Sequence, residues 1–294
     1  MFSAEHLNEN VRTALELSDE ERIRRIQSPR WIGYTRTREI LDSLEELLNY
    51  PKTHRMPNLL IVGVTNNGKT MIANRFVQKH PPSDNPDGNS ISVPALMIQA
   101  PPVSDESRFY NVILEKTFAP FRERDHASKK QAQAISILKN INVGMLIIDE
   151  IHNLLAGHTD KQRQMLNVIR YLGNELKIPI VGIGTMDAFR ALQTDPQLSN
   201  RFEPMTIPKW DMDKEYLRLL GSFELMIPLK KPSGLIEDSL ALKLLSMSEG
   251  TIGDLSRILT KAAVYAVRNG VERITGNVLD SVEWIRPSDR GRQM

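Results

Sequence analysis

Eight consecutive residues in the first third of the chain have the types and spacing of a phosphate-binding P-loop. They are Gly63-Val64-Thr65-Asn66-Asn67-Gly68-Lys69-Thr70. Glycines let such a loop curl so that its backbone N–H groups face phosphate, the lysine reaches the terminal phosphates, and the hydroxyl after it can ligate Mg²⁺. An apolar run precedes the loop and a helix-like segment follows it, which favours this interpretation over a chance turn. We therefore expect these residues to bind ATP, with Thr70 as a ligand of Mg²⁺.

Two adjacent carboxylates, Asp149 and Glu150, have the types needed for nucleotide hydrolysis. They follow the apolar run 145–148, and ligands bind at the carboxyl ends of strands in open α/β sheets. We expect Asp149 to hold Mg²⁺ through water, and Glu150 to orient or deprotonate the water that attacks the γ-phosphate. An Asp-Glu pair also commonly opens a helix, but the P-loop upstream favours an ATPase.

The sequence does not indicate thiol or zinc chemistry. The chain has no cysteine, and its six histidines show no spacing typical of metal ligands. His152, two residues after Glu150, has the position of a phosphate sensor. We expect it instead to be a histidine packed at the start of the next helix, and we leave it out of the site.

The elements that must position these residues are those of an α/β domain. Continuous apolar runs, typical of parallel strands covered on both faces, occur at 59–62, 95–98, 144–148 and 180–183. Each is separated from the next by enough residues for a crossover helix. Apolar residues at helical spacing predict another helix from Thr35 that ends before Pro51. The expected fold class is α/β, with a mainly parallel sheet flanked by helices.

Patterns along the 294 residues predict four parts. Residues 1–30 are mostly polar, and Ser18 followed by Glu21 has capping-box spacing, which predicts a short helical arm. Residues 31–210 hold the strands and the ATP motifs. Residues 211–285 show only helical patterns, which predicts a small all-helical lid domain. The polar, arginine-rich residues 286–294 are expected to be a loose tail.

The composition is that of an ordinary soluble globular protein, with 40% apolar and 25% charged residues. There is no run of eighteen apolar residues, and the amino terminus lacks the layout of a signal peptide. We therefore expect a cytoplasmic protein that does not bind a membrane. The formal net charge of +2 neither demands nor excludes a nucleic-acid partner, so any basic surface must be local.

The motifs resemble those of AAA+ ATPases, and the resemblance implies further site residues. Thr185 ends the strand beside the P-loop strand, where AAA+ proteins keep their first sensor; the alternative is a simple helix N-cap. Arg201, in the segment 198–202, resembles the arginine finger that reaches into a neighbouring subunit's nucleotide. The planar, always-charged guanidinium suits a transition-state phosphate. The alternative is an ordinary arginine near a helix C-terminus.

Two more segments resemble parts of the AAA+ nucleotide pocket. Residues 253–257 are similar to the second-sensor helix, from which Arg257 would contact the γ-phosphate when the lid closes. The alternative is a solvated arginine on the polar face of an amphipathic helix. Trp31 and Tyr34 stand upstream of the P-loop, where AAA+ proteins line the adenine pocket, but aromatic residues there can equally be core.

Over nearly its whole length the chain resembles the TniB/TnsC group, the ATPase regulators of bacterial transposons. The more particular features are Trp31-Ile32-Gly33-Tyr34, Asp149-Glu150-Ile151-His152-Asn153-Leu154-Leu155 and Asn174-Glu175-Leu176-Lys177-Ile178-Pro179-Ile180. The resemblance implies a homo-oligomer, loaded with ATP, on double-stranded DNA. It also implies that this oligomer connects a target-selecting protein of the TniQ type to the transposase and leaves DNA on hydrolysis.

Cations between and after the two ATP motifs are candidates for DNA contacts, because these segments often face the central channel of AAA+ rings. The candidates are Arg122, Arg124, Lys129, Lys130, Lys161 and Arg163. Repeated around an oligomer, they would bind phosphates without reading bases, so DNA binding would be sequence-nonspecific. Nearby acids dilute this charge, and ordinary solvated surfaces are the alternative.

Other functions stay open at this point. A replication-initiator or clamp-loader switch would also bind DNA. A secretion or protein-remodelling ATPase would need a channel-facing aromatic loop, of which the sequence gives no clear sign. A scaffold that binds ATP without hydrolysing it is disfavoured by Glu150, because binding alone does not need that carboxylate.

Overall fold

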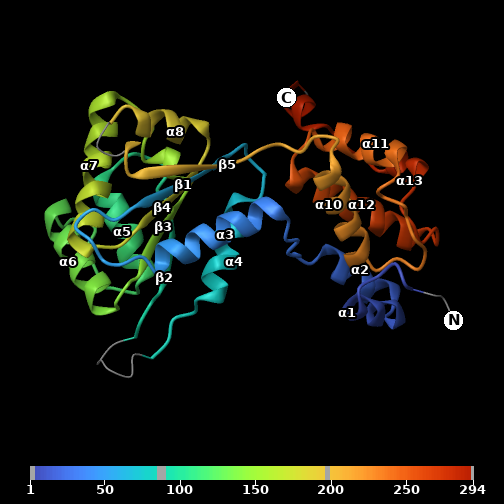
Figure 1. Cartoon of the computed structure of the whole chain (residues 1–294), viewed down its shortest axis with the longest axis horizontal. Coiled ribbons are helices and arrows are strands. Elements are labelled where there is room, and N and C mark those ends of the chain that lie inside the picture. The colour runs from blue at the N-terminus through green and yellow to red at the C-terminus, as the bar shows by residue number, and fades with distance from the viewer. Residues whose placement is uncertain (1–3, 85–90, 196–198, 293–294) are drawn as a thin grey trace. The chain divides into compact units, whose positions relative to one another are not determined.

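A computed structural model describes residues 4–84, 91–195 and 199–292 of the chain, which form two compact units (Figure 1). The sheet unit consists of residues 36–65 and 69–207. The helical unit consists of the residues up to Thr35, Asn66–Gly68, and the residues from Pro208 onward. Each unit has its own hydrophobic core.

Five parallel strands form the sheet, in the order β2-β3-β4-β1-β5. Their bounds are β1 (Asn58–Gly63), β2 (Ala95–Gln99), β3 (Met145–Asp149), β4 (Ile180–Gly184) and β5 (Phe202–Ile207). Strands β1, β3 and β4 are buried along their whole length, because helices and neighbouring strands cover them. The predicted α/β fold with a parallel sheet is confirmed.

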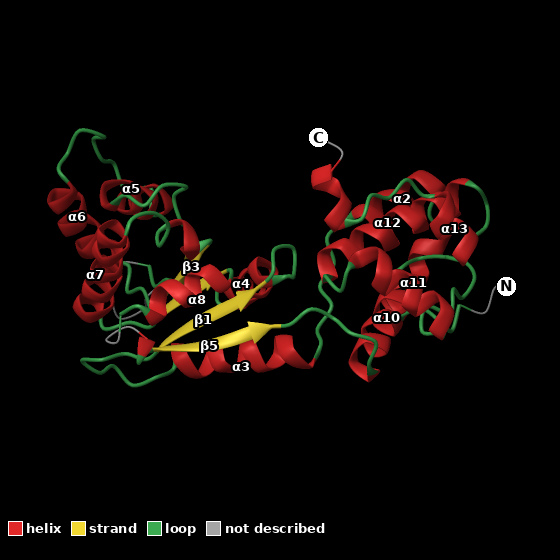
Figure 2. Ribbon diagram, turned by 90° about the horizontal axis from the view of Figure 1, so that it is seen from above, coloured by secondary structure: helices red, strands yellow, loops and turns green. Residues whose placement is uncertain are grey.

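Helices connect the strands and flank the sheet (Figure 2). They are α3 (Thr35–Leu48), α4 (Lys69–Lys79), α5 (Glu106–Lys116), α6 (Ala127–Asn140), the short 3₁₀ helix η2 (Ile151–Asn153), α7 (Thr159–Leu176) and α8 (Met186–Gln193). Parallel strands need such crossovers. Since all five strands run the same way, their carboxyl ends lie along one edge of the sheet and their amino ends along the other.

The register aligns the strands that carry the ATP motifs. Gln99 of β2 pairs with Asp149 of β3, and Leu60 of β1 pairs with Gly182 of β4. Strand β4 lies between β3 and β1. The P-loop after β1 and the carboxylates at the end of β3 therefore flank the end of β4 on the same edge.

The sequence does not predict β5, which is an edge strand paired to β1. Its ends are buried, but Glu203, Pro204 and Thr206 are exposed and interrupt the apolar pattern. Proline lacks an N–H donor and is tolerated on an edge strand. No continuous apolar run exists there from which a strand could be predicted.

The helical unit contains helices from both ends of the chain. They are α1 (Glu9–Arg12), η1 (Thr13–Glu16), α2 (Asp19–Gln27), α10 (Lys214–Met226), α11 (Asp238–Ser248), α12 (Ile252–Arg268), α13 (Gly276–Ser281) and η3 (Pro287–Arg292). The predicted capping box is present: Ser18 Oγ accepts from Glu21 N, and Ser18 N donates to Glu21 Oε2. Within the described ranges, no helix is both long enough and apolar enough to cross a membrane.

Helix α2 is built into the core of the helical unit. Ile26 of α2 and Ile32 after it pack with residues of α10 to α13. Arg22 of α2 is fully buried and donates two hydrogen bonds to Glu272, of 2.7 and 2.6 Å. An ion pair inside the core thus joins α2 to the connection between α12 and α13.

The expectation of a loose tail over 286–294 is wrong for the described residues. Arg290 Nη2 donates to Asp254 Oδ1 at 2.7 Å, and the Arg290 guanidinium lies 5.1 Å from the ring centre of Trp284. Ser288 N donates to Glu249 Oε1 at 3.0 Å. These contacts hold η3 on the helical unit; residues 293 and 294 lie outside the described ranges.

Candidate active site

The P-loop connects β1 to α4 at the carboxyl-terminal edge of the sheet. Lys69 and Thr70 form the first turn of α4, where unpaired N–H groups and the helix dipole favour an anion. Gly68 has a φ of 82°, in the left-handed region that glycine adopts without strain. The loop therefore has the backbone expected of a phosphate-binding turn.

The Lys69 ammonium lies across the P-loop. Its Nζ donates to the carbonyl oxygens of Gly63, at 2.9 Å, and Val64, at 2.8 Å. Burial lowers the pKa of Lys69, and the charges of Glu150 and Asp149 partly oppose that shift. A buried cation between the loop and two carboxylates is suited to bind the terminal phosphates of ATP.

A hydrogen bond joins the two ATP motifs. Thr70 Oγ1 donates to Asp149 Oδ2 at 2.8 Å, and Glu150 N donates to Asp149 Oδ1 at 2.9 Å. The hydroxyl and the carboxylate are oxygen ligands of the kind that Mg²⁺ takes, together with water and nucleotide phosphates. Thr70 and Asp149 therefore fit the predicted Mg²⁺ site, in which the ion would neutralise the charge that develops on ATP phosphates.

Glu150 differs from Asp149 in both backbone and surroundings. Its φ of 54° and ψ of 36° are left-handed, a conformation that costs a residue other than glycine free energy and is often kept at functional sites. Its side chain is partly exposed, whereas Asp149 is buried. This arrangement leaves the Glu150 carboxylate accessible to a water molecule, as a general base requires.

His152, which the sequence did not place in the site, contacts Glu150. The His152 Nε2 atom lies 3.2 Å from Glu150 Oε2. His152 Nδ1 is buried and has no hydrogen-bond partner among the described residues. The sequence offered only a separation of two residues as a signal, and the contact depends on the turn that Glu150 and η2 form.

Thr185 directly follows β4, between the two ATP motifs in the strand order. It is the N-cap residue of α8, but its hydroxyl makes no capping hydrogen bond. Thr185 Oγ1 is buried and has no partner among the residues that the structure describes. A capping role for this hydroxyl therefore has no support, and its position suits the predicted sensor.

Arg201 lies on the opposite edge of the sheet. It precedes β5, whose first residue, Phe202, pairs with the first residue of β1, Asn58. The P-loop begins at the other end of β1, roughly 17 Å away at the usual rise per strand residue. Arg201 Nη1 donates to Asn174 Oδ1 at 2.9 Å. Arg201 therefore cannot serve the nucleotide of its own chain.

The tip of the P-loop belongs to the helical unit and is held by α12. Asn66 Nδ2 donates to Asp254 Oδ2 at 2.9 Å, and Gly253 N donates to Asn66 O at 3.0 Å. A Cβ on Gly253 would lie 2.0 Å from Asn66 Oδ1, so this close approach requires glycine. Asn67 Nδ2 donates to Pro208 O at 2.8 Å. The sequence gave no sign that Asn66 and Asn67 bind protein groups.

Three residues implied by the resemblance lie in the helical unit. Arg257 is exposed on α12, one turn after Gly253. Trp31 and Tyr34 are half-buried, and the Tyr34 ring meets Trp210 edge to face, with 4.8 Å between ring centres. Tyr34 therefore packs against the core of this unit.

The DNA candidates differ in how available their charges are. Arg122, Arg124, Lys161 and Arg163 are exposed. Lys129 is exposed but forms an ion pair of 3.0 Å with Asp125. Lys130 is only 1% exposed, and its Nζ donates to Ser107 Oγ and to Glu123 O. The DNA prediction for Lys130 is wrong, because this ammonium is used inside the sheet unit.

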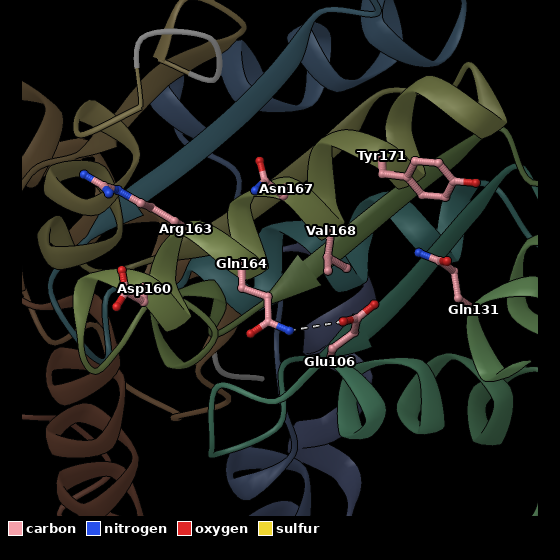
Figure 3. Close-up of a pocket in the computed structure, with 8 residues that line it drawn as sticks. All are labelled: Glu106, Gln131, Asp160, Arg163, Gln164, Asn167, Val168 and Tyr171. Carbon is pink, nitrogen blue, oxygen red and sulfur yellow. Dashed lines mark hydrogen bonds between the residues drawn. The ribbon is translucent and has the colours of Figure 1, made fainter. Parts of the chain in front are cut away.

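A pocket of about 440 Å³ lies between α5, α6 and α7 of the sheet unit. Its lining consists of Glu106, Gln131, Asp160, Arg163, Gln164, Asn167, Val168 and Tyr171 (Figure 3). Gln164 Nε2 donates to Glu106 Oε2 at 3.3 Å across it. Arg163 shares this lining with two acids, so the pocket itself is not a concentrated phosphate-binding surface.

Comparison with known proteins gives a family and a fold. The family model described as "Bacterial TniB protein" matches residues 22–212. No curated protein matches the chain.

Solved structures with a similar fold include Cdc6p and ORC proteins. Cdc6p from Pyrobaculum aerophilum has a TM-score of 0.61 at 16% identity, over 88% of this chain and 68% of that one. The Aeropyrum pernix ORC1 protein, in complex with DNA, has a TM-score of 0.59 at 16% identity, over 85% and 65%. Drosophila ORC bound to DNA has a TM-score of 0.56 at 14% identity, over 93% and 66%. The chain spans about two thirds of these proteins, and it shares their AAA+ fold.

Proposed function

Because the chain belongs to the bacterial TniB family and is an ATPase with the AAA+ fold, we propose that it regulates DNA transposition in the cytoplasm. Copies loaded with ATP and Mg²⁺ assemble on double-stranded DNA. The assembly connects a target-selecting protein of the TniQ type to the transposase, and it leaves DNA after ATP hydrolysis.

One observation carries this proposal: the groups that bind ATP and the arginine suited to its hydrolysis lie on opposite edges of the same sheet. Lys69, Thr70, Asp149 and Glu150 follow strand ends at the carboxyl-terminal edge, whereas Arg201 precedes β5. An arginine finger stabilises the charge of the transferring phosphoryl group. Arg201 can do so only for another copy, so hydrolysis depends on assembly.

The remaining candidates have definite roles in the proposal. Thr185 senses the γ-phosphate between the two ATP motifs, and Arg257 reaches the same phosphate from α12. Trp31 and Tyr34 line the adenine pocket. Their support is the position of Thr185 after β4 and the attachment of α12 to the P-loop tip through Asn66.

DNA binding is proposed from the exposed cations of the sheet unit. Arg122 and Arg124 lie on the connection between α5 and α6, and Lys161 lies in the first turn of α7. Phosphate contacts of this kind give affinity without sequence preference. Two proteins with a similar fold, ORC1 of Aeropyrum pernix and Drosophila ORC, have structures with DNA.

The Glu150→Gln change tests the proposal. The variant keeps the size of the side chain but loses the general base. A general base accelerates a reaction roughly 10²- to 10⁴-fold. We expect it to form ATP-dependent oligomers on duplex DNA that persist, while wild type dissociates as ATP is consumed. Electron microscopy and single-molecule residence times on duplex DNA measure both.

Lys69→Ala is the matched control, because it removes the phosphate-binding cation and should prevent ATP-dependent assembly. Equal residence of Glu150→Gln and wild type on DNA would contradict release by hydrolysis. If the wild-type protein assembled on DNA equally well with and without ATP, the proposal as a whole would be contradicted.

A protein-remodelling ATPase is a second candidate, favoured by one side chain. Phe118, on the connection between α5 and α6, is 96% exposed and has a left-handed φ of 53°. The sequence alone gave no clear sign of such an aromatic loop. Stimulation of ATP hydrolysis by an unfolded polypeptide, without stimulation by duplex DNA, would favour this candidate over transposition.

A further inference from the structure

The connection between α5 and α6 exposes an aromatic side chain where the backbone favours glycine. Helix α5 ends in a Schellman motif, in which Phe118 N donates to Glu115 O at 3.0 Å and Ala119 N donates to Leu114 O at 2.9 Å. Phe118 occupies the left-handed position of this motif, with a φ of 53°, and is 96% exposed. Glycine is the usual residue there because it has no Cβ. Phe118 is therefore unfavourable for the backbone, and its ring gains no burial within the fold.

The connection that carries this exposed ring is attached to the sheet unit at several points. The Phe121 side chain packs against the core of the unit. The buried Lys130 ammonium donates to Glu123 O at 2.9 Å, and Gln133 Nε2 donates to Pro120 O at 2.7 Å. Figure 2 shows the connection as a loop that extends beyond the ends of both helices. The backbone is thus pre-organised, which lowers the entropy lost when a partner binds.

Cations flank the exposed ring in the sequence. Residues 116–124 include Lys116, Arg122 and Arg124 but a single acid, Glu123, and all four charged side chains are exposed. An apolar ring among cations fits a partner that has both negative charge and apolar surface. Duplex DNA has both, since phosphates line its strands and its bases have flat apolar faces. An unfolded polypeptide offers apolar side chains but no regular row of negative charges.

We infer that Phe118 is a wedge that enters duplex DNA between two stacked base pairs, while Arg122 and Arg124 bind the neighbouring phosphates. This inference rests on the proposed function, because it requires that the chain binds duplex DNA. It adds a contact with the bases to the phosphate contacts proposed above. Apolar wedges of this kind partly unstack a base step and bend the duplex. Stacking on a ring is tolerant of sequence, so binding remains nonspecific.

A wedge and a phosphate contact respond differently to salt and to the strength of base stacking. Phosphate contacts release counterions, so their number sets the slope of log affinity against log salt. Insertion of a neutral ring releases none, so loss of the ring lowers the affinity by the same factor at every salt concentration. Unstacking a base step costs free energy, and a mismatch lowers that cost. The wild-type protein should therefore bind a mismatched duplex more tightly than an intact one.

Variants of Phe118 test the inference with a non-hydrolysable ATP analogue and duplexes that are intact or carry one mismatch. Each duplex contains 2-aminopurine, whose fluorescence rises when it unstacks. Phe118→Gly and Phe118→Asn remove the ring, and both residues tolerate a left-handed backbone. Phe118→Trp keeps an aromatic ring. Tyr50→Ala, which removes another exposed ring of the sheet unit, is the matched control.

Phe118→Gly and Phe118→Asn should bind the intact duplex about 5-fold more weakly or worse, because stacking on the ring is lost. Their salt slope should equal that of wild type. Both should lose the rise in 2-aminopurine fluorescence and the preference for the mismatched duplex. Phe118→Trp should retain these properties, and Tyr50→Ala should behave like wild type. Thermal unfolding should show Phe118→Gly to be at least as stable as wild type.

The outcomes separate failure of the wedge from failure of the proposed function. If wild type and Phe118→Gly bind duplex with equal affinity and equal fluorescence, the wedge is wrong and the proposed function stands. The same holds if Phe118→Gly loses ATP-dependent assembly without DNA, because the ring then contacts another copy.

Failure of wild type to bind either duplex with the ATP analogue would overturn the proposed function together with the wedge. Both would also be overturned if an unfolded polypeptide stimulated ATP hydrolysis by wild type but not by Phe118→Gly, while duplex DNA stimulated neither protein.

Discussion

At the scale of single residues, the two carboxylates of the hydrolysis motif, Asp149 and Glu150, have different surroundings and therefore differ in how freely they can contact water. Asp149 is buried, and both of its oxygens accept hydrogen bonds, from Thr70 and from the backbone N–H of Glu150. Glu150 is partly exposed, and its side-chain contact is His152. Asp149 is thus held in one orientation by hydrogen bonds, whereas the Glu150 carboxylate can exchange His152 for water.

The contact between His152 and Glu150 makes His152 a positioning residue. We predict that His152→Ala lowers kcat about 10- to 100-fold, as losses of orienting partners typically do, with KM for ATP nearly unchanged. His152→Gln places a neutral donor near the same carboxylate and should recover part of the rate. Steady-state kinetics of both variants measures the split between kcat and KM.

His158→Ala is the control for this prediction, because His158 is exposed before α7 and its side chain makes no capping hydrogen bond. A His152→Ala protein with normal kcat would show that the contact with Glu150 has no part in hydrolysis. A His152→Gln protein that is no faster than His152→Ala would lead to the same conclusion.

Candidate site residues could be predicted where the residues of a motif are consecutive in the sequence. The P-loop and the Asp149–Glu150 pair are local motifs, and the structure brings them together through Thr70. The contact between Arg201 and Asn174 could not be predicted, because only the folded sheet unit brings α7 to the start of β5. Lys130 was wrongly assigned to DNA because sequence does not reveal burial.

At the scale of elements, α2 shows how a polar segment becomes part of a core. Arg22 carries a buried charge into the helical unit, and Glu272 and Asp19 neutralise it. Burial alone would raise the pKa of Glu272, but the hydrogen bond and charge of Arg22, together with the backbone N–H of Lys230, lower it overall. The pair therefore links the stability of this unit to pH.

We predict that Glu272→Gln destabilises the helical unit by about 3–5 kcal/mol near neutral pH, because it removes the buried carboxylate of the pair and leaves the buried Arg22 guanidinium with the exposed carboxylate of Asp19. The folded-state pKa of Glu272 lies below its ordinary value of 4.5. The stabilisation is therefore present above the unfolded pKa and is lost as pH falls through the lower folded value. Denaturant unfolding of both proteins from pH 7 to pH 3 should show the difference shrinking in acid.

Asp19→Asn is the matched control. Asp19 also binds Arg22, at 2.7 Å, but its side chain is 65% exposed. Exposed ion pairs contribute about 0–1 kcal/mol, so this change should have little effect at any pH. A Glu272→Gln protein as stable as Asp19→Asn at pH 7 would contradict the role given to the buried pair.

Elements could be predicted where one physical pattern dominates. The interior strands are continuous apolar runs, and α2 begins with a capping box. Strand β5 was missed because half-exposed edge positions carry no such run. The carboxyl-terminal segment looked like a tail because its order comes from side chains distant in sequence, Asp254 and Glu249.

At the scale of the whole molecule, duplex binding should depend on salt. We predict that Arg122→Ala combined with Arg124→Ala lowers the slope of log affinity against log salt by about 1.8 for each copy bound, since each phosphate contact contributes about 0.9. The test measures the DNA affinity of the double variant, made in the Glu150→Gln background, between about 50 and 200 mM salt. Arg218→Ala, an exposed arginine paired with Glu215 on α10, is the control and should leave the slope unchanged.

The placement of nucleotide groups and arginines on opposite edges gives any row of copies a direction. Contacts of this kind are head-to-tail, so they either close into a ring or leave two unlike ends. In an open row, the copy at one end holds ATP that no arginine faces, and its hydrolysis is slow. The copy at the other end carries an Arg201 side chain with no phosphate to bind. Such a row would retain triphosphate longest at one terminus, and its growth and its disassembly would proceed at different rates from the two ends.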